Sequence, residues 1–262
     1  MPDLVNLDKL PGPVRLAVEH CLAEMVALHG DNLLSALVYG SGTGRDYLPG
    51  VSDINLLFVF REITLDTLKR SLKTIARGRR RKMAAPLFLT REYMEQSTDV
   101  FPIEFLEFAD NRVLVYGTDP FEQLVVEREN LRLECEGQLK SQLVRLRQVY
   151  LETGLRARDL DRLLKASLSA LIPVFRALYR LKGQPVPGGK ESVLNRLNPV
   201  YEVDPSVFLE IWHDRKNNNR IGARHAEEAL GRYITEIFNL AGQVACLDPG
   251  APGRRENPGP EA

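Results

Sequence analysis

Two short apolar runs with a glycine-rich segment between them limit what the first half of this chain can form. The runs are LLSALVYG at 33–40 and SDINLLFVF at 52–60, and the segment between them is SGTGRDYLPGV. Each run is too short for a buried helix and is bounded by turn residues, which predicts two buried strands. A helix is predicted over 13–29, because apolar residues recur there every three or four positions and Gly30 follows. This order predicts a mixed α/β domain.

The chain continues in the same alternating manner up to about residue 125. A helix is predicted over 64–77, with an acidic residue near its start and basic residues at its end, as the helix dipole favours. Three further strands are predicted at 85–90, at 102–108 (PIEFLEF) and at 112–117 (RVLVYG). Together these elements indicate a small mixed sheet with helices.

The second half has a different pattern, typical of long helices. Apolar residues at helical spacing predict helices over 129–153, 159–181, 190–197, 205–216 and 223–247. These segments suit a helical bundle, and the final residues have almost no apolar content. We therefore expect an α+β protein with an α/β domain at 1–127, an all-helical bundle domain at 128–247 and a disordered tail at 248–262.

Composition and charge exclude several classes of function. The 262 residues contain 35 Lys and Arg and 35 Asp and Glu, so no strongly basic surface for nucleic acid is expected. No apolar run reaches about 18 residues, and the N-terminus has no export-signal pattern, so we expect a cytoplasmic protein without a membrane partner. The three cysteines and four histidines show no metal-ligand or disulfide spacing, and the cysteines are expected to be buried. The oligomeric state does not follow from the sequence.

The glycine-rich junction carries the clearest chemical signal. Gly40 and Ser41 end the first predicted strand, and Asp53 and Asn55 open the second. A Gly-Ser pair at a strand end lets backbone amides and a hydroxyl approach phosphate oxygens. Alternate residues of a strand point to the same face, so Asp53 and Asn55 can share one metal ion. Mg²⁺ prefers such oxygen ligands and shares them with substrate phosphates.

This pattern resembles the nucleotidyltransferase superfamily of the DNA polymerase β type, in particular its aminoglycoside and lincosamide adenylyltransferase-like branch. The family has an apolar Gly-Ser, about ten further residues, a pair of carboxylates two residues apart, and a third carboxylate on a later strand. Gly40, Ser41 and Asp53 match the pattern, and Glu104 is the candidate for the later strand. Glu107 is the alternative to Glu104, and strand alternation would place the two on opposite faces.

The resemblance implies a metal-dependent transfer of a nucleotidyl group, most simply adenylyl from ATP, to a hydroxyl of an unknown small molecule or protein. It implies that Gly40 and Ser41 contact the nucleotide, that Asp53, Asn55 and Glu104 hold Mg²⁺ or Mn²⁺, and that Asp53 and Glu104 are catalytic. Asn55 departs from the family, because it stands where the second carboxylate belongs. A catalytically degenerate nucleotide-binding or interaction module of the same fold is therefore the alternative.

A basic cluster follows the predicted helix at 64–77. It consists of Arg77, Arg79, Arg80, Arg81 and Lys82. No aromatic residues interrupt it, as a surface for single-stranded nucleic acid would require. We expect it to be a solvated basic surface at a helix end.

Overall fold

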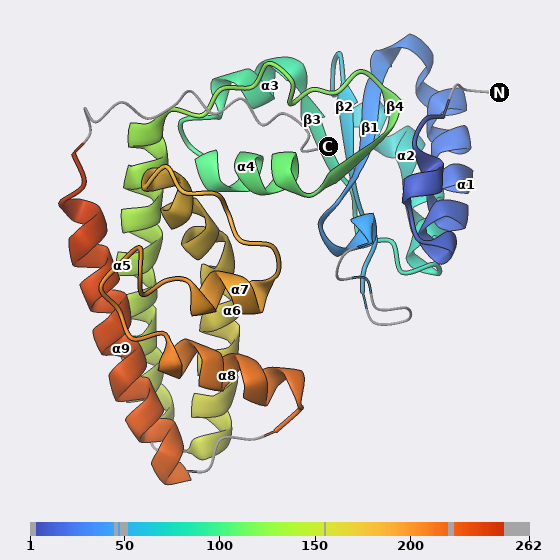
Figure 1. The fold of residues 1–262 in the computed structure, drawn as a ribbon. Coiled ribbons are helices and arrows are strands. Elements are labelled where there is room, and N and C mark those ends of the chain that lie inside the picture. Colours follow the sequence, from blue (N-terminus) through green and yellow to red (C-terminus); the bar gives the residue numbers. More distant parts are fainter. Residues whose placement is uncertain (1–3, 45–46, 48–51, 155, 220–222, 249–262) are drawn as a thin grey trace. The chain divides into compact units, whose positions relative to one another are not determined.

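A computed structural model describes residues 4–44, 47, 52–154, 156–219 and 223–248. It divides the chain into two compact units (Figure 1). Among the described residues, the first unit contains the chain up to Thr98 together with Glu104–Val125, and the second contains Asp99–Ile103 and the chain from Val126 to Asp248. The predicted α+β class is confirmed, since a mixed sheet with helices is followed by a helical region. Of the predicted disordered tail, all but Asp248 lies outside the described residues.

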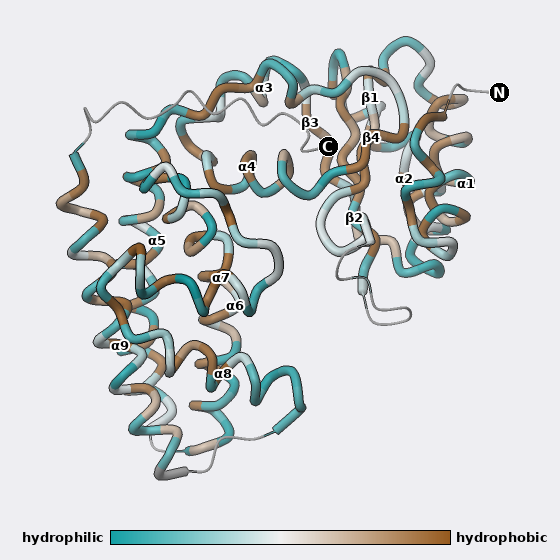
Figure 2. The backbone as a smooth tube through the Cα atoms, in the orientation of Figure 1, coloured by the Kyte–Doolittle hydropathy of each residue, from teal (hydrophilic) through white to brown (hydrophobic). Residues whose placement is uncertain are grey.

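The sheet of the first unit has four strands in the order β3-β2-β1-β4. Their bounds are β1 Leu33–Tyr39, β2 Asn55–Phe60, β3 Leu87–Thr90 and β4 Arg112–Gly117. β1 pairs antiparallel with both β2 and β4, whereas β2 and β3 are parallel. The strands predicted around residues 33–40, 52–60, 85–90 and 112–117 are therefore confirmed. Hydrophobic residues follow these strands in Figure 2.

Helix α1, Gly12–His29, covers one face of this sheet. Its apolar stripe packs against alternate residues of the strands, and the resulting core includes Met25 of α1, Val38 of β1 and Phe58 of β2, all fully buried. Strand alternation requires that the intervening residues point to the opposite face. The two faces of the sheet therefore have separate surroundings, and this decides where the candidate site can lie.

Helix α2, Leu65–Arg79, packs against α1 with an unusual face. Its buried residues are small or polar: Thr67, Ser71, Thr74 and Gly78. Three leucines of the helix are exposed instead, namely Leu65, Leu68 and Leu72. The buried hydroxyls are satisfied locally, since Ser71 donates to the Thr67 carbonyl at 2.9 Å and Thr74 donates to Glu24 at 2.6 Å. The contact between α1 and α2 is thus largely hydrogen-bonded.

The segment predicted as a strand at 102–108 is a helix, α4, Pro102–Asp110. Each of its two glutamates stands between apolar residues, and this alternation led to the prediction of a strand instead of a helix. Its buried residues Ile103, Phe105, Leu106 and Ala109 are in fact spaced by three or four, and a proline suits the first turn of a helix. A second short helix, α3 at Arg91–Gln96, was not predicted. The Thr90 hydroxyl caps it by accepting a hydrogen bond from the Tyr93 amide at 3.1 Å.

The second unit is helical in its described part. Its helices are α5 Arg128–Thr153, α6 Ala157–Leu181, α7 Lys190–Asn195, α8 Ser206–Lys216 and α9 Ala223–Ala245. Helix α6 is buried around much of its circumference, and buried tyrosines connect it to its neighbours. The Tyr179 hydroxyl donates to the Val193 carbonyl at 2.6 Å, and the Tyr201 hydroxyl donates to the Leu178 carbonyl at 3.0 Å. None of the described helices is long and apolar enough to cross a membrane.

Two glycine-to-alanine substitutions test the described backbone, because we expect them to change the free energy of unfolding in opposite directions. Gly117 has φ +75°, and a Cβ built there would lie 2.0 Å from the Leu34 carbonyl oxygen. We expect Gly117→Ala to lower the free energy of unfolding by at least about 2 kcal/mol, as measured by urea denaturation. Gly137 lies within α5 with open space around it, so Gly137→Ala should raise that free energy by about 1 kcal/mol. Equal losses in both variants would contradict the described backbone.

Candidate nucleotide site

The Gly-Ser and Asp-Asn pairs meet at one end of the sheet. β1 ends at Tyr39, which lies directly opposite Asn55, the first residue of β2. Gly40 and Ser41 follow within a short 3-10 turn, η3 at Gly40–Thr43. Two hydrogen bonds stabilise this turn, from the Thr43 hydroxyl to the Gly40 carbonyl at 2.8 Å and from the Gly44 amide to the Ser41 carbonyl at 3.2 Å. Antiparallel register therefore brings together residues that are 12 or more positions apart.

Asp53 and Asn55 point away from the hydrophobic core beneath α1. Ile54, between them, is fully buried in that core and pairs with Met83. In an extended chain the two flanking side chains then project from the opposite face. The exposure agrees, since Asp53 is exposed and Asn55 is half-buried. These two residues are thus available to a ligand at the end of β2.

Gly40 has the backbone conformation and the space that a close approach requires. Its φ of +69° is one that glycine adopts without strain, and its amide donates to the Asn111 carbonyl at 2.9 Å. A Cβ at Gly40 would lie 3.6 Å from Nδ2 of Asn55. The Asn55 amide group therefore lies directly beside the Gly-Ser turn, so both can contact one ligand.

Arg112 belongs to the same row of residues but serves the scaffold. It lies opposite Tyr39 on β4, so Arg112, Tyr39 and Asn55 form one row across three strands. Its guanidinium forms an ion pair with Asp119, at 2.8 Å between Nη2 and Oδ2, and also donates to the Ala109 carbonyl at the end of α4. Sequence patterns did not identify this role; the short spacing from Arg112 to Asp119 was the available signal. The ion pair orients Arg112, and its hydrogen bond to Ala109 holds the end of α4 next to the candidate site.

Glu104 lies in the first turn of α4 and not on a strand. Four residues later, Phe108 makes an edge contact with the Tyr39 ring at 4.8 Å between centroids. Residues four apart share one side of a helix, so Glu104 lies on the side of α4 that carries Phe108. Its Oε2 atom is buried and has no hydrogen-bond partner among the described residues. Glu107 is one turn away and not on the opposite face, so the expectation based on strand alternation was wrong.

Strand β3, the parallel neighbour of β2, carries no carboxylate. Leu87 pairs with Leu57, so Leu87 and Leu89 lie on the same face as Asn55. No group of three or more His, Cys, Asp or Glu side chains in the described ranges is placed to hold a metal ion. The donor set at the end of β2 is therefore one carboxylate and one neutral amide oxygen, which fits a weakly held divalent ion that shares its ligands with a phosphate.

The four-stranded sheet, the turn after β1 and the helical second unit have a counterpart among solved structures, in agreement with the predicted resemblance in fold. Among solved structures, the chain is similar to spectinomycin adenyltransferase AAD(9) from Enterococcus faecialis, which was determined with ATP and spectinomycin. The TM-score is 0.53, the sequence identity is 14%, and the likeness covers 86% of this chain and 98% of that one. At this identity the likeness establishes the fold. No family model matches the sequence, and no curated protein matches it.

Restoring the missing acidic groups tests the metal-binding role of this end of the sheet. Asn55→Asp should tighten Mg²⁺ or Mn²⁺ binding about tenfold, because it adds a charged ligand beside Asp53. Adding Leu87→Glu should tighten it further, since Leu87 is on the same face and is 37% exposed. Isothermal titration calorimetry measures both effects. Asn198→Asp, an exposed change of the same charge in the second unit, is the matched control and should leave metal affinity unchanged.

Proposed function

We propose that this chain binds a nucleoside triphosphate, most simply ATP, and transfers its nucleotidyl group to a hydroxyl of a small-molecule or protein acceptor. The observation that carries the proposal is the register of β1 and β2. It pairs Tyr39 with Asn55, so that Gly40 lies next to the Asn55 amide group, and Ser41 and Asp53 are their chain neighbours at the same end of the sheet. The similarity in fold to an adenyltransferase determined with ATP and spectinomycin supports the same reading.

Each site residue has a distinct task in this proposal. The Ser41 hydroxyl and the backbone amides that follow Gly40 donate hydrogen bonds to phosphate oxygens, and Gly40, which has no side chain, leaves room for that approach. Asp53 supplies the charged oxygen ligand for Mg²⁺ or Mn²⁺, and Asn55 supplies a neutral carbonyl oxygen. The metal ion, when bound, supplies a Lewis acid that neutralises charge on the triphosphate. Glu104 adds an oxygen ligand or accepts the proton of the attacking hydroxyl.

A second candidate function is nucleotide binding without transfer. The specific observation in its favour is that Leu87 and Leu89 occupy the face of β3 next to Asn55, so the neighbouring strand adds no charge. Two-metal displacement relies on carboxylates to clamp both ions, and this site supplies fewer of them. A binding or interaction module would retain the Gly-Ser turn and lose the metal dependence.

Asp53→Ala distinguishes the two candidates at the level of binding. For a transferase we expect Mg²⁺ to tighten ATP binding about tenfold, equal to about 1.4 kcal/mol, and Asp53→Ala to abolish that gain. Asp31→Ala, an exposed change elsewhere in the first unit, should retain it. Calorimetric titration of ATP, once with Mg²⁺ and once with a chelator, measures the two ATP affinities that are compared. Equal ATP affinity of the unaltered chain and of Asp53→Ala, each measured with Mg²⁺ and with the chelator, would favour the binding module.

Transfer itself is tested with ATP labelled at the α-phosphate. The full chain is incubated with a set of hydroxylated metabolites and, separately, with cell lysate, and labelled acceptors are resolved chromatographically. The proposal expects label on an acceptor with the unaltered chain and at least a hundredfold less with Asp53→Ala, because the charged metal ligand is lost. Binding of ATP with no labelled acceptor in either set would contradict transfer and leave the binding module.

A further inference from the structure

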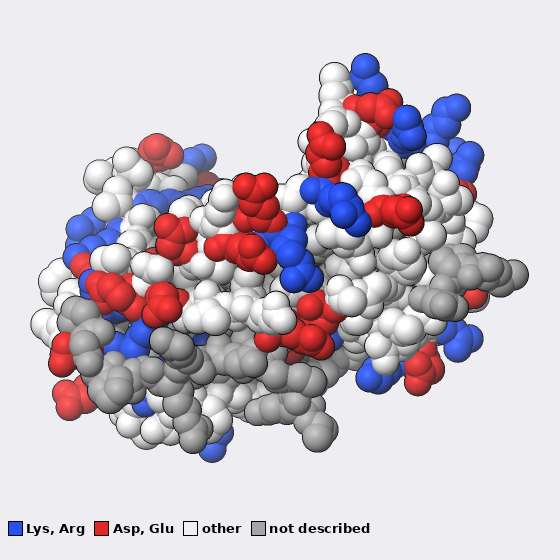
Figure 3. All heavy atoms as spheres, turned by 90° about the horizontal axis from the view of Figure 1, so that it is seen from above, with Lys and Arg blue, Asp and Glu red and all other residues white. Residues whose placement is uncertain are grey.

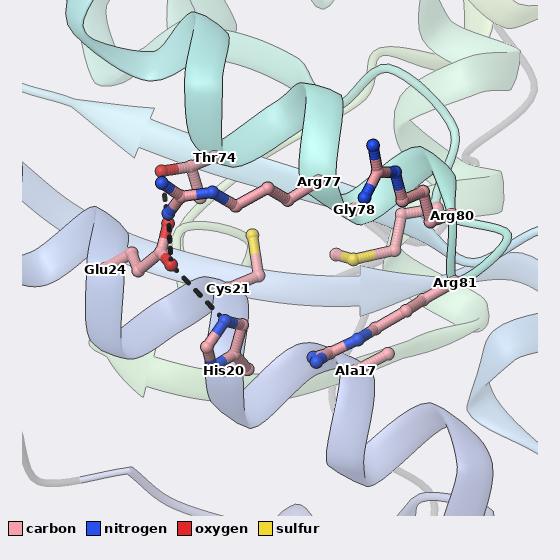
Figure 4. A pocket seen from close by; sticks show the side chains of 10 residues that line it. Ala17, His20, Cys21, Glu24, Thr74, Arg77, Gly78, Arg80 and Arg81 are labelled. Carbon is pink, nitrogen blue, oxygen red and sulfur yellow. Dashed lines mark hydrogen bonds and ion pairs between the residues drawn. The ribbon is translucent and has the colours of Figure 1, made fainter.

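A pocket of about 210 Å³ lies between α1 and α2, away from the candidate nucleotide site (Figure 4). Ala17, Cys21 and Met83 give it apolar surfaces, and it is smaller than the roughly 300–1,000 Å³ usual for drug-sized ligands. It exists because α1 and α2 meet here through small residues. At Gly78 a Cβ would lie 2.9 Å from the Met83 sulfur, so a larger residue there would require the Met83 side chain to shift.

The acidic group of this pocket is already committed to partners. Glu24 accepts a hydrogen bond from Thr74 at 2.6 Å and pairs with Arg77 at 2.8 Å and with His20 at 3.3 Å. The hydrogen bond from Thr74, reinforced by Arg77, lowers the pKa of Glu24, so it is a carboxylate at neutral pH. Arg77 is therefore neutralised by Glu24.

Arg80 and Arg81 line the same pocket without such compensation. Neither has an acidic partner within the described part of the chain. Figure 4 shows Arg81 reaching from the turn after α2 toward Ala17, with Arg80 above it and the Cys21 sulfur between the two helices. Burial raises the pKa of the Cys21 thiol to about 12, although the charge of Arg81 partly offsets this effect. The thiol is therefore uncharged at physiological pH and contributes an apolar surface to the pocket.

We propose that the α1–α2 pocket binds a small organic phosphate monoester. Its dianionic phosphate lies between Arg80 and Arg81, whose two charges it balances, and its short apolar group contacts Cys21 and Met83. Guanidinium groups suit this role because their planar donors match phosphate oxygens in pairs. The volume of the pocket limits the apolar part to a small ring or a short chain.

The pocket also has a direct backbone link to the candidate nucleotide site on the other face of the sheet. The turn that carries Arg80 and Arg81 continues into Lys82, whose carbonyl accepts a hydrogen bond from the Ile54 amide at 2.8 Å. The Ala84 amide in turn donates to the Ile54 carbonyl at 3.0 Å. Ile54 separates Asp53 from Asn55, so the segment that follows the pocket is hydrogen-bonded to the residue between these two candidate site residues.

The test titrates phenyl phosphate into the full chain by calorimetry in the absence of nucleotide. Inorganic phosphate lacks the apolar group, benzoate carries a single charge, and benzyl alcohol is uncharged. We expect phenyl phosphate to bind at least tenfold more tightly than each of these three. Arg80→Gln and Arg81→Gln should each weaken it at least tenfold.

Arg79→Gln is the matched control, because Arg79, the last residue of α2, is exposed and does not line the pocket. It should change the affinity for phenyl phosphate less than twofold. Thermal unfolding of each variant confirms that it is folded. Equal weakening by Arg79→Gln and Arg81→Gln would show non-specific attraction and overturn the proposal, as would equal affinity for phenyl phosphate and inorganic phosphate. ATP binding is measured separately, so a negative result here leaves the proposed function intact.

Discussion

The antiparallel pairing of β1 with β2 is the interaction on which the candidate site depends. It sets Tyr39 opposite Asn55, and through that register the turn at Gly40–Thr43 lies beside the Asn55 amide group. A slip of one residue would turn Asp53 and Asn55 into the core beneath α1 and expose Ile54 and Leu56. The same apolar burial that stabilises the sheet therefore fixes which side chains a ligand can reach.

Charge is distributed locally and not as one field over the surface. Acidic and basic side chains are interspersed on the face drawn in Figure 3, consistent with the equal numbers of Lys and Arg and of Asp and Glu. Arg80 and Arg81, which have no acidic partner among the described residues, lie in the turn that follows the end of α2. The residues of the basic cluster are exposed, as expected of a solvated surface, and Arg80 and Arg81 also border the pocket.

Much of the fold could be predicted because periodicity and stop residues agree. In α1 the apolar stripe and Gly30 define one helix, and in β1 a compact apolar run ends at Gly40. The failure at α4 has a physical cause: a run of nine residues fits both a two-residue and a three-to-four-residue period, and only tertiary contacts such as Phe108 with Tyr39 select one. The roles of Asp53, Asn55 and Glu104 stay predictions. The pairing of Leu87 with Leu57, which puts Leu87 on the same face as Asn55, follows from strand order, and local sequence does not encode strand order.

Helix α2 buries small and polar residues and exposes leucines, and this affects how the first unit opens. Hydroxyl groups and a glycine face α1, while leucines face solvent, so separating α2 from α1 exposes little apolar surface. Its hydrogen bonds can be replaced by water, whereas separating α1 from the strands would expose Met25, Val38 and Phe58 together. Opening the α1–α2 contact therefore costs less free energy than separating α1 from the strands, and amides of α2 would exchange with solvent before those of β1 and β2. A ligand seated between the two helices would raise that cost by its own binding free energy.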